Sequence, residues 1–301
     1  MNWVVGIDGG GTHTRAALAR ADSGIIVGRG SGGPGNFHSG TRETLLFSVE
    51  EAVNQAFGMA GLLPEPVARI VAGLAGAGTA SARREAGIAI GSLPWAQTAH
   101  IEVISDLELA FSAAFGSRAG VLLVAGTGSS CLARDKSGDL HQVGGWGALL
   151  DDDGSAFDLS RRALRALVFA FDGRGPSTAL REAIFNQWGI SCHNEFLQAL
   201  RERSTPGALA GLARSVLDTA AAGDIPAKQV VEEATDGLVT MVQTALRKCG
   251  DPPPPVSLHG GLFATDAYRE ALERRIHSTF PSVKFSRLRA DLAEAATTYQ
   301  G

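Results

Sequence analysis

The chain has 301 residues, of which 45% are hydrophobic and 19% are charged, with 38 glycines and 12 prolines. This composition excludes an intrinsically disordered chain, a collagen and a coiled coil. The 27 Lys and Arg residues are outnumbered by 31 Asp and Glu residues, so the formal net charge is -4 and no positive field would gather a nucleic acid or an anionic membrane. At about 150 residues per domain, the length predicts two globular domains.

Three cysteines, Cys131, Cys192 and Cys249, are 61 and 57 residues apart in the sequence. That spacing lacks the close pairs of a zinc site, and an odd number of cysteines does not suit a disulfide framework. No run approaches the roughly 18 apolar residues that a membrane span needs, and no basic segment with a cleavage site precedes the first apolar run. We therefore expect a cytoplasmic protein that begins at its first residue and stays in a reducing compartment.

The first 30 residues are typical of three strands joined by tight turns. Apolar runs at residues 3–7, 16–19 and 25–27 are separated by a turn at residues 22–24 and by the Gly/Thr-rich turn Asp8-Gly9-Gly10-Gly11-Thr12-His13-Thr14. Short apolar runs divided by Gly, Asp and Ser predict hairpins.

The next segments alternate between helix and strand patterns. Residues 41–60 carry apolar residues at helical spacing, which predicts an amphipathic helix. Strands are predicted at residues 69–74 and 101–105, and a helix-like run follows at residues 107–115. Such alternation indicates a sheet covered by helices.

Residues 121–145 repeat the plan of the N-terminal segment. Strand-like runs at residues 121–124, 131–133 and 140–143 are separated by a turn at residues 136–139 and by the turn Gly126-Thr127-Gly128-Ser129-Ser130. Aligning Thr12 with Thr127 gives an offset of 115 residues, and aligning Gly24 with Gly138 gives 114. The near-constant offset predicts two duplicated domains, with a boundary at residues 117–120.

The rest of the chain, from Ser155 onward, is predicted to be mostly helical. Strand-like segments interrupt it at residues 256–258 and 283–285. Pro252 to Pro255 mark the entry into the first of these strands, because proline presets an extended backbone. Together with the N-terminal pattern, these segments predict an α/β fold.

Both Gly-rich turns have the chemistry of a phosphate-binding loop. Small residues let the backbone approach a ligand, and their N–H groups can converge on an anion without obstruction from side chains. Each turn also contains a threonine, whose hydroxyl adds a donor. Neither turn is a Walker A loop, and neither opens a helix as a GxGxxG motif does. One such turn alone is typical of a plain hairpin, but two in register favour phosphate binding.

Two aspartates directly follow predicted strands. Asp8 precedes the first turn, where a carboxylate can hold the water shell of a Mg²⁺ ion bound to phosphates. Asp106 lies between the strand at residues 101–105 and the helix-like run behind it. Taken alone, Asp106 fits a helix N-cap as well as it fits a catalytic carboxylate, so both interpretations stay open at this point.

The combination of motifs resembles the N-acetylglucosamine kinase family. The segments that carry the resemblance are Gly6-Ile7-Asp8-Gly9-Gly10-Gly11-Thr12, Ala125-Gly126-Thr127-Gly128-Ser129, and Gly144-Gly145-Trp146-Gly147 followed by Asp152-Asp153-Gly154-Ser155. They cover most of residues 1–160, and the C-terminal half is similar more loosely. That family, with its BadF/BadG-type ATPase domain, belongs to the actin-like ATPases together with other sugar kinases and Hsp70.

The resemblance implies an α/β fold of two duplicated actin-like (ribonuclease H-like) domains with a nucleotide cleft between them. The N-terminal domain would span residues 1–118, joined by a C-terminal segment at about residues 289–301 whose helix covers about residues 290–300. The C-terminal domain would span residues 119–288.

The resemblance also implies roles for individual residues. The two phosphate loops would be formed by Gly9, Gly10, Gly11 and Thr12, and by Gly126, Thr127, Gly128 and Ser129. The adenosine motif would be Gly260 and Gly261 in the segment 257–261, with Ala220 beside the base. Asp106 would be the catalytic carboxylate facing the 6-hydroxyl of the sugar, and Asp8 would hold Mg²⁺ through water. The remaining sugar contacts would be Asn36, Gly145, Trp146, Gly147 and Asp152.

The implied activity is an ATP- and Mg²⁺-dependent kinase that phosphorylates the 6-hydroxyl of an amino sugar, N-acetylglucosamine or glucosamine. Its partners would be that small molecule and a second copy of the chain in a homodimer. The acidic run Asp151-Asp152-Asp153 differs from the family's usual Gly-Asp-Glu and favours an amino sugar with a free ammonium group.

Three alternatives are open. One is a kinase for another sugar, such as N-acetylmuramic acid. The second is an ATPase activator of 2-hydroxyacyl-CoA dehydratases or benzoyl-CoA reductases, which needs paired cysteine ligands for an iron–sulfur cluster. The third is a nonenzymatic, nucleotide-switched or sugar-sensing protein.

Other conspicuous residues have structural interpretations. Trp146 is either a wall under the sugar or a buried core aromatic. Cys131 is expected to be a small buried strand residue, and His13 and His259 are expected to form surface or core hydrogen bonds. A cluster of arginines is expected to form the solvated face of a helix: Arg161, Arg162 and Arg165.

Overall fold

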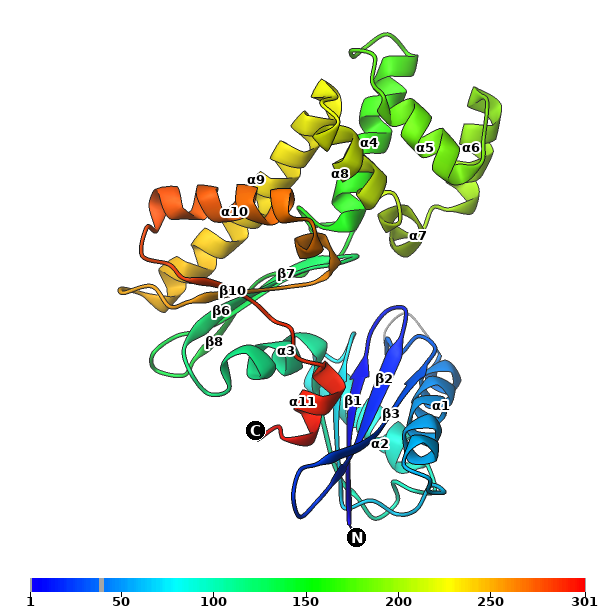
Figure 1. The fold of residues 1–301 in the computed structure, drawn as a ribbon, viewed down its shortest axis with the longest axis vertical. Helices are drawn as coiled ribbons and strands as arrows, with labels where there is room; N and C mark the ends of the chain where they lie inside the picture. Colours follow the sequence, from blue (N-terminus) through cyan, green and yellow to red (C-terminus); the bar gives the residue numbers. More distant parts are fainter. Residues whose placement is uncertain (1, 38–40, 301) are drawn as a thin grey trace. The chain divides into compact units, whose positions relative to one another are not determined.

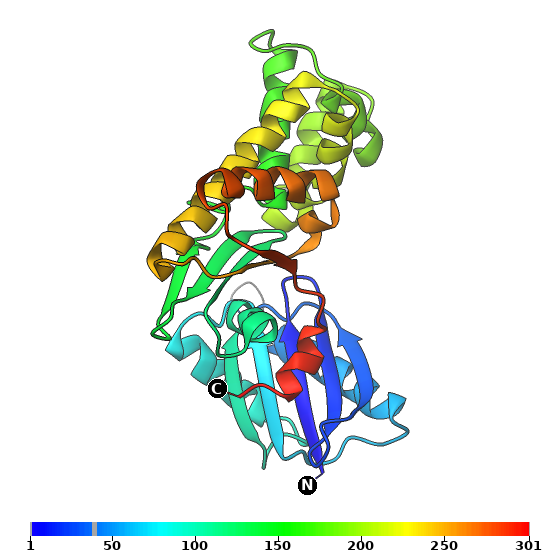
Figure 2. The ribbon, with the colours of Figure 1, turned by 60° about the vertical axis from the view of Figure 1, so that its left-hand side comes forward.

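The computed structural model describes residues 2–37 and 41–300, and the chain divides into two compact units. The first unit runs to Ser117 and also contains the segment from Leu288 onward, while the second runs from Arg118 to Arg287. Each unit has a five-stranded sheet of its own (Figures 1 and 2). Most of the buried apolar side chains fall into two clusters, one in each unit. Two cores are what a chain of this length is expected to form.

The sheet of the first unit has the strand order β3-β2-β1-β4-β5. Its strands are β1 (Trp3–Gly9), β2 (Thr14–Arg20), β3 (Ile26–Gly32), β4 (Arg69–Leu74) and β5 (His100–Ser105). The first three pair antiparallel, and β4 and β5 continue the sheet parallel to β1. Parallel neighbours need crossover connections, which here contain the helices α1 (Arg42–Met59) and α2 (Ala80–Gly91).

The sheet of the second unit has the order β10-β9-β6-β7-β8. Its strands are β6 (Gly120–Ala125), β7 (Ser129–Arg134), β8 (Leu140–Gly144), β9 (Val256–His259) and β10 (Phe285–Arg287). Here too an antiparallel meander of three strands is extended by two strands parallel to the first of them. The repeated topology confirms the duplication that the two Gly-rich turns predict.

The second unit inserts six helices between β8 and β9, as the sequence pattern predicts. They are α4 (Ala156–Phe171), α5 (Leu180–Trp188), α6 (His193–Glu202), α7 (Pro206–Ala210), α8 (Ala213–Ala221) and α9 (Ile225–Cys249). The short η1 (Gly261–Ala264) and α10 (Asp266–Thr279) connect β9 to β10. The long helix α9 contacts the sheet at β7 and β8 and also packs against α4, α8 and α10. It therefore joins the sheet to the helical layer.

Two short helices complete the first unit, α3 (Asp106–Phe115) and α11 (Leu292–Thr297). The helix α11 packs on β1 and β2, and Figure 1 shows it on the opposite face of the sheet from α1. A Cβ atom added to Gly6 would lie 2.0 Å from the carbonyl oxygen of Ala293, so the backbones of β1 and α11 touch. The C-terminal helix is thus shorter than the predicted residues 290–300, and it docks on a glycine of the first strand.

Glycines on β3 allow α1 to pack at backbone distance. Cβ atoms added to Gly28, Gly30 and Gly32 would lie 1.9, 2.0 and 2.1 Å from carbonyl oxygens of α1. Alternate residues of a strand share one face, so these glycines form one smooth stripe on which the helix lies. No side chain larger than hydrogen fits there without moving the helix.

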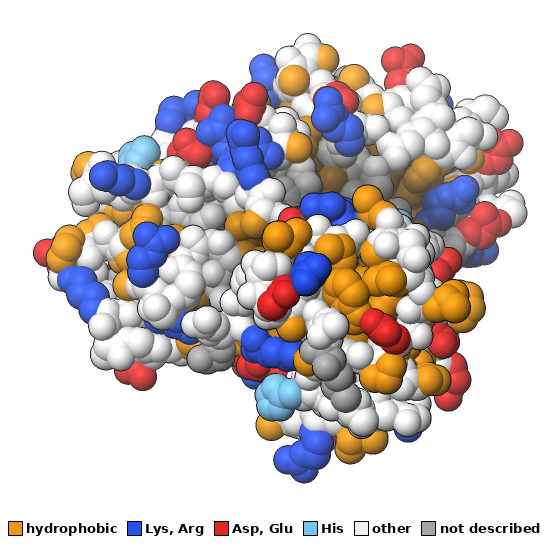
Figure 3. All heavy atoms as spheres, turned by 60° about the horizontal axis from the view of Figure 1, so that its bottom comes forward, with side chains coloured by type: hydrophobic (Ala, Val, Ile, Leu, Met, Phe, Trp, Pro, Cys, Tyr) orange, Lys and Arg blue, Asp and Glu red, His pale blue; other side chains and the backbone are white. Residues whose placement is uncertain are grey.

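The surface carries mixed charge. On the face shown in Figure 3, Lys and Arg side chains are interspersed with Asp and Glu side chains. This distribution agrees with the small net charge of -4. Among the described residues, no helix has the length and apolar character needed to cross a membrane.

The arginines of α4 are not simply solvated, and the prediction is wrong for Arg162. Its side chain is only 26% exposed and bonds to Asp158 at 2.8 Å and to Glu233 at 3.0 Å. Arg161 bonds to the same Asp158 carboxylate at 2.8 Å. Because α9 packs against α4, it brings Glu233 to Arg162, a long-range contact that helical spacing in α4 alone does not predict.

Candidate active site

The first Gly-rich turn connects β1 to β2 in the first unit and is closed at its base and open at its tip. A Cβ atom added to Gly9 would lie 2.6 Å from Leu74 and 3.0 Å from the carbonyl oxygen of Gly35. A Cβ atom added to Gly11 would meet nothing within 4 Å, and both Gly11 and Thr12 are exposed. The tip therefore presents bare backbone, which is the surface that a phosphate group needs.

Asp8 and Asp106 lie at the same edge of the first sheet. The register pairs Asp8 with Gly73 on β4 and pairs Leu74 with Ser105 on β5, and Asp106 follows immediately. Because β1, β4 and β5 run parallel, their carboxyl ends meet at one edge. The charge of Asp106 contributes to raising the pKa of Asp8, so the structure brings together two carboxylates that are 98 residues apart in the sequence.

Asp106 is the first residue of α3, and Ser105 is the N-cap. The Ser105 hydroxyl accepts a hydrogen bond from the Glu108 amide, and the Glu108 carboxylate accepts one from the Ser105 amide. This capping box means that the N-cap interpretation of Asp106 is wrong. One Asp106 oxygen, Oδ1, accepts from the amide of Leu107 at 2.9 Å, which fixes the side chain.

Burial raises the pKa of both carboxylates. It raises the pKa of Asp8 to about 6, with additional contributions from the charges of Asp106 and Asp291 and an opposing one from Arg15. Burial also raises the pKa of Asp106, against hydrogen bonds from backbone amides. A carboxyl group that resists ionisation in the free protein is stabilised as a carboxylate when a cation binds next to it. The pair therefore has the electrostatics of a site that receives positive charge.

Replacing Asp8 with asparagine is expected to stabilise the protein, measured without nucleotide or metal. The Asp8 carboxyl binds its proton more tightly when folded, so its contribution to stability is full below pH 4 and declines as the pH rises through about 6. The free energy of unfolding of Asp8→Asn should exceed that of the parent by an amount that grows by about 2 kcal/mol between pH 4 and pH 7.5. This is the order expected for a pKa shift of this size. Urea unfolding across that range measures it. A difference that does not change with pH would contradict the raised pKa.

Asn36 lies near the base of the first turn. The amide of Gly35 donates to the carbonyl of Gly10 at 2.9 Å, and the amide of Phe37 donates to the carbonyl of Ala75 at 2.9 Å. These bonds fold the segment before α1 back over the ends of β1 and β4 and hold Asn36, which is half-buried, at that edge. The first unit thus brings Asn36, Asp8, Asp106 and the first turn together.

The second Gly-rich turn connects β6 to β7 in the second unit and is tied to the start of α4. The amides of Ala156 and Phe157 donate to the carbonyls of Gly126 and Thr127 at 2.8 and 3.2 Å. A Cβ atom added to Gly126 would meet nothing within 4 Å. This turn therefore also combines a fixed base with open backbone.

Asp152 holds the second turn directly. Its Oδ1 accepts from the amide of Ser129 at 3.0 Å, and a Cβ atom added to Gly128 would lie 2.8 Å from the same oxygen. The Ser129 hydroxyl donates to the carbonyl of Asp153 at 2.7 Å. Both Ser129 donors are therefore used within the protein, and Ser129 can serve phosphate binding only by fixing the turn.

The backbone of Asp152 has φ 66°, a left-handed conformation that is rare for a residue with a side chain. Burial raises the pKa of its carboxyl, while the Ser129 amide opposes that change. Backbone strain of this kind persists when neighbouring contacts determine the conformation. Asp152 therefore connects the second Gly-rich turn to the segment that precedes α4.

Trp146 is exposed, so its interpretation as a buried core aromatic is wrong. Its side chain is 78% exposed, and its amide donates to the Asp151 carboxylate at 3.3 Å. The neighbouring Gly145 abuts β7, since an added Cβ atom would lie 2.6 Å from the Ser130 hydroxyl oxygen. Gly147 has φ 88°, a conformation that favours glycine. The segment is therefore held at its base, while its aromatic side chain projects into solvent.

Gly260 directly follows β9 and packs against the end of β6, the strand that leads into the second turn. It has φ 112°, and an added Cβ atom would lie 2.2 Å from the carbonyl oxygen of Ala125, the last residue of β6. Gly261, which begins η1, has open space in place of a side chain. Ala220 is a buried core residue of α8, so the structure gives it a packing role and its contact with an adenine base stays a prediction.

The cysteines differ in accessibility. Cys131 and Cys249 are buried, and burial raises the pKa of both thiols, whereas Cys192 is exposed before α6. The prediction that Cys131 is a buried strand residue is confirmed.

The histidine of the first Gly-rich turn, His13, is exposed.

A thiol-specific reagent should label one cysteine of the native protein quickly, Cys192, and all three cysteines after unfolding. Mass spectrometry of the digested protein identifies the labelled residue. The variant Cys192→Ser should show no fast phase. Fast labelling of Cys131 in the native protein would contradict its burial.

A model of the BadF/BadG/BcrA/BcrD ATPase family matches residues 5–295 of the chain. The chain belongs to this family. The match covers nearly the whole sequence, including both Gly-rich turns, Asp106 and the start of α11. Membership confirms the BadF/BadG-type ATPase domain that the motifs predict.

The chain is similar to several amino-sugar kinases. The chain is 28% identical over 300 residues to the N-acetylmuramic acid/N-acetylglucosamine kinase of Clostridium acetobutylicum, covering 98% of this chain and 97% of that one. It is 35% identical over 192 residues to a glucosamine kinase of Vibrio cholerae, covering 62% of each chain. A solved protein of Chromobacterium violaceum, provisionally assigned as an N-acetylglucosamine kinase, matches with a TM-score of 0.81 and 26% identity, covering 99% and 98% of the two chains. These similarities confirm the predicted α/β fold class and family resemblance.

Several residues that shape the candidate site could not be predicted from the sequence. Arg15 and Asp291 influence the carboxyl of Asp8 electrostatically, and they come from β2 and from the N-cap of α11. Gly35 packs against Gly9. A signal for Gly35 was present in the Gly-rich run just before Asn36, but nothing in the sequence connects Asp291 to Asp8.

Proposed function

We propose that the protein is an ATP-dependent kinase that transfers phosphate to the 6-hydroxyl of an amino sugar, N-acetylglucosamine or glucosamine. The observation that carries the proposal is the position of Asp106. Its carboxylate is fixed at the start of α3, at the sheet edge that also holds Asp8 and the first Gly-rich turn. The named kinase activities of the relatives support the same reaction class.

Both Gly-rich turns are assigned to the phosphates of ATP. Gly11 is exposed and Gly126 is half-buried, and no atom lies within 4 Å of the place where either would carry a side chain. Turns of this kind bind anions through backbone N–H groups. The adenosine would lie near Gly260 and Gly261, at the end of β9. This assignment fits the open backbone that each turn presents.

The carboxylates of Asp8 and Asp106 suit Mg²⁺, a hard cation that prefers oxygen ligands. Among the described residues, no group of three or more His, Cys, Asp or Glu side chains could hold a metal ion. Mg²⁺ usually keeps several waters and is bound by phosphates with one or two carboxylates, so Asp8 would hold it through water. When bound, Mg²⁺ neutralises charge on the phosphates.

Asp106 would orient the sugar hydroxyl and accept its proton. Phosphoryl transfer passes through a loose transition state, so the acceptor needs alignment more than strong deprotonation, and the proton can leave late. The raised pKa of Asp106 makes its carboxylate a better proton acceptor than an exposed aspartate. Its bond from the Leu107 amide keeps one oxygen fixed and leaves the other for the hydroxyl.

The sugar ring is assigned to Asn36, Asp152 and the segment 145–147. Asp152 uses Oδ1 for the Ser129 amide, which leaves Oδ2 to accept from a ring hydroxyl or the 2-substituent. The exposed Trp146 supplies an apolar surface for a ring face. Asp152 would therefore hold the second Gly-rich turn with one carboxylate oxygen and contact the sugar with the other.

The buried cysteines oppose the iron–sulfur activator alternative. A cluster shared at a dimer interface needs paired cysteines at the surface of each chain, whereas Cys131 and Cys249 are buried among the core residues of the second unit and Cys192 is the exposed cysteine. The cytoplasmic location and the homodimer that the sequence suggests stay predictions.

A screen of ADP release tests the proposal and selects the acceptor. The purified protein is given ATP and Mg²⁺ with glucosamine, N-acetylglucosamine, N-acetylmannosamine, N-acetylmuramic acid or glucose in turn. We expect sugar-dependent ADP release with glucosamine or N-acetylglucosamine. ADP release that no sugar stimulates would overturn the kinase assignment, and stimulation by N-acetylmuramic acid alone would move the assignment to that acceptor.

A further inference from the structure

A cavity of about 370 Å³ lies within the second unit, between α4, the loop that follows α4, and α9. Its volume is in the range of small-ligand pockets, about 300 to 1,000 Å³. Most of its wall is apolar. The residues that form this part are Ala166, Phe169, Pro176, Pro226 and Val230.

Three arginines of α4 line the same cavity, Arg161, Arg162 and Arg165. Asp158 and Glu233 balance part of their charge, through bonds to Arg161 and Arg162. Arg165 is exposed and, among the described residues, has no carboxylate partner; its guanidinium carbon lies 5.0 Å from the centroid of the Phe169 ring. The cavity wall therefore carries a positive group whose hydrogen-bond donors are available to a ligand.

We propose that this cavity is a binding site for a small amphipathic anion, with an oxyanion head group and an aromatic or branched apolar body. The planar guanidinium group of Arg165 suits two-point recognition of a carboxylate or phosphate. The apolar wall next to it suits the body of the ligand. The site goes beyond the proposed kinase reaction, because none of its residues belongs to the Gly-rich turns or the carboxylate pair.

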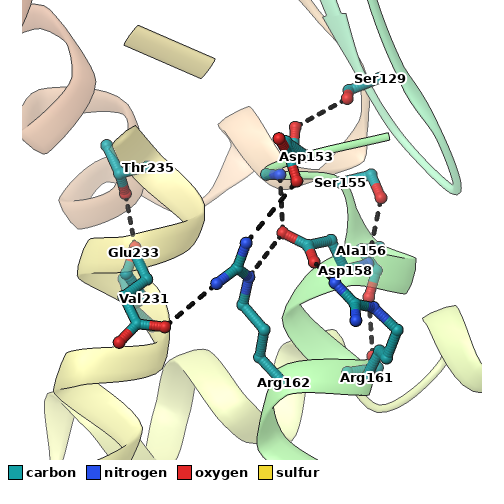
Figure 4. A network of polar contacts seen from close by, with 12 residues as sticks. Ser129, Asp153, Ser155, Ala156, Asp158, Arg161, Arg162, Val231, Glu233 and Thr235 are labelled. Carbon is teal, nitrogen blue, oxygen red and sulfur yellow. Dashed lines mark hydrogen bonds and ion pairs between the residues drawn. The ribbon is translucent and has the colours of Figure 1, made fainter. Parts of the chain in front are cut away.

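The cavity is connected to the second Gly-rich turn by a chain of polar contacts (Figure 4). Arg162, which lines the cavity, bonds to Asp158, and Asp158 accepts from the amide of Gly154 at 3.0 Å. Arg162 also lies 3.6 Å from the side-chain carboxylate of Asp153. The backbone carbonyl of Asp153 accepts a hydrogen bond from the Ser129 hydroxyl. An anion that draws Arg162 toward the cavity would compete with these carboxylates. Anion binding and nucleotide binding should therefore influence each other.

Calorimetric titration of the full chain with 3-phenylpropionate tests the site. We expect saturable binding that becomes at least about tenfold weaker in Arg165→Gln, as for the loss of one charge-assisted hydrogen bond. The neutral 3-phenylpropionamide should bind at least tenfold more weakly than the acid. Arg214→Gln, which removes an exposed arginine of α8, should bind like the parent. No binding, or equal binding by Arg165→Gln, would overturn the proposal.

Two further probes separate the kinds of head group and body. Phenylphosphonate tests a phosphate-type head, and inorganic phosphate tests a head without a body. The proposal expects phenylphosphonate to bind more tightly than inorganic phosphate and to lose affinity in Arg165→Gln. Equal affinity for the two probes would show that the apolar wall contributes nothing and would overturn the amphipathic site.

Coupling is measured by titrating a nonhydrolysable ATP analogue with and without saturating 3-phenylpropionate. The proposal expects the analogue's Kd to change at least threefold, with the same factor in the reciprocal titration, because linkage is symmetric. An unchanged Kd would overturn the connection to the second turn. These readouts are binding constants, so failure of the kinase assay would not imitate failure of this site.

Discussion

Replacing Asp106 with asparagine is expected to lower kcat by at least about 100-fold, which corresponds to roughly 3 kcal/mol of lost transition-state stabilisation. Asparagine keeps an oxygen that can accept from the Leu107 amide, so the start of α3 should be preserved. What it loses is the ability to accept the proton of the sugar hydroxyl. Affinity for ATP should change little, because the phosphate turns are left intact.

Asp266→Asn is a matched control for this variant. Asp266 is also the first residue of a helix, α10, but its side chain is 73% exposed and pairs with Arg269 on the surface. Its replacement should leave kcat and KM within about twofold of the parent values. Steady-state kinetics on all three proteins make the comparison. Near-normal turnover by Asp106→Asn would remove Asp106 from the catalytic role.

Asp158→Asn should destabilise the protein by about 3 kcal/mol, since the buried Asp158 carboxylate would lose its charge-assisted bonds to two arginines. The Asp158 side chain is 2% exposed and accepts from Arg161, Arg162 and the amide of Gly154. It fixes the segment that carries Asp152 and hence the second Gly-rich turn. Urea unfolding of both proteins at pH 7 measures the difference.

Asp218→Asn tests whether burial, rather than the pairing itself, causes that loss. Asp218 also pairs with an arginine one helical turn away, Arg214, but its side chain is 60% exposed. Exposed pairs contribute little, so this replacement should change the free energy of unfolding by about 0.5 kcal/mol or less. Equal losses in the two variants would show that the burial of Asp158 has no special effect.

The fold could be predicted from the sequence to a large extent because its signals are local. The strand at residues 69–74 coincides with β4, and the helix at residues 41–60 with α1, because hydrophobic periodicity and the turn residues around them agree. The duplication could be predicted from the sequence because each half has a Gly-rich turn at a corresponding position between two strands. β3 extends beyond the predicted run through small residues, such as Gly30 and Gly32, that have low strand propensity. Packing against α1 favours glycine there.

The candidate site was predictable only in part, since its residues belong to separate motifs. Asp8 and Asp106 could each be singled out as residues that follow strands, but their electrostatic contact depends on strand order in the sheet. The amide and the hydroxyl of Ser129 donate to Asp152 and Asp153, and these two hydrogen bonds also depend on tertiary packing. Exposure of Trp146 could not be predicted, because an aromatic residue between glycines fits either environment.

The proposed kinase reaction requires that Asp106 direct a sugar hydroxyl onto the terminal phosphate of ATP. The most direct measurement is ³¹P NMR of the complete reaction, ATP, Mg²⁺ and the preferred amino sugar with the protein, followed over time. We predict the appearance of a phosphomonoester on the 6-oxygen of the sugar in equal amount to ADP, with both abolished or slowed at least about 100-fold in Asp106→Asn. Inorganic phosphate formed in place of a sugar ester, or ester formation at the parent rate by Asp106→Asn, would contradict the claim.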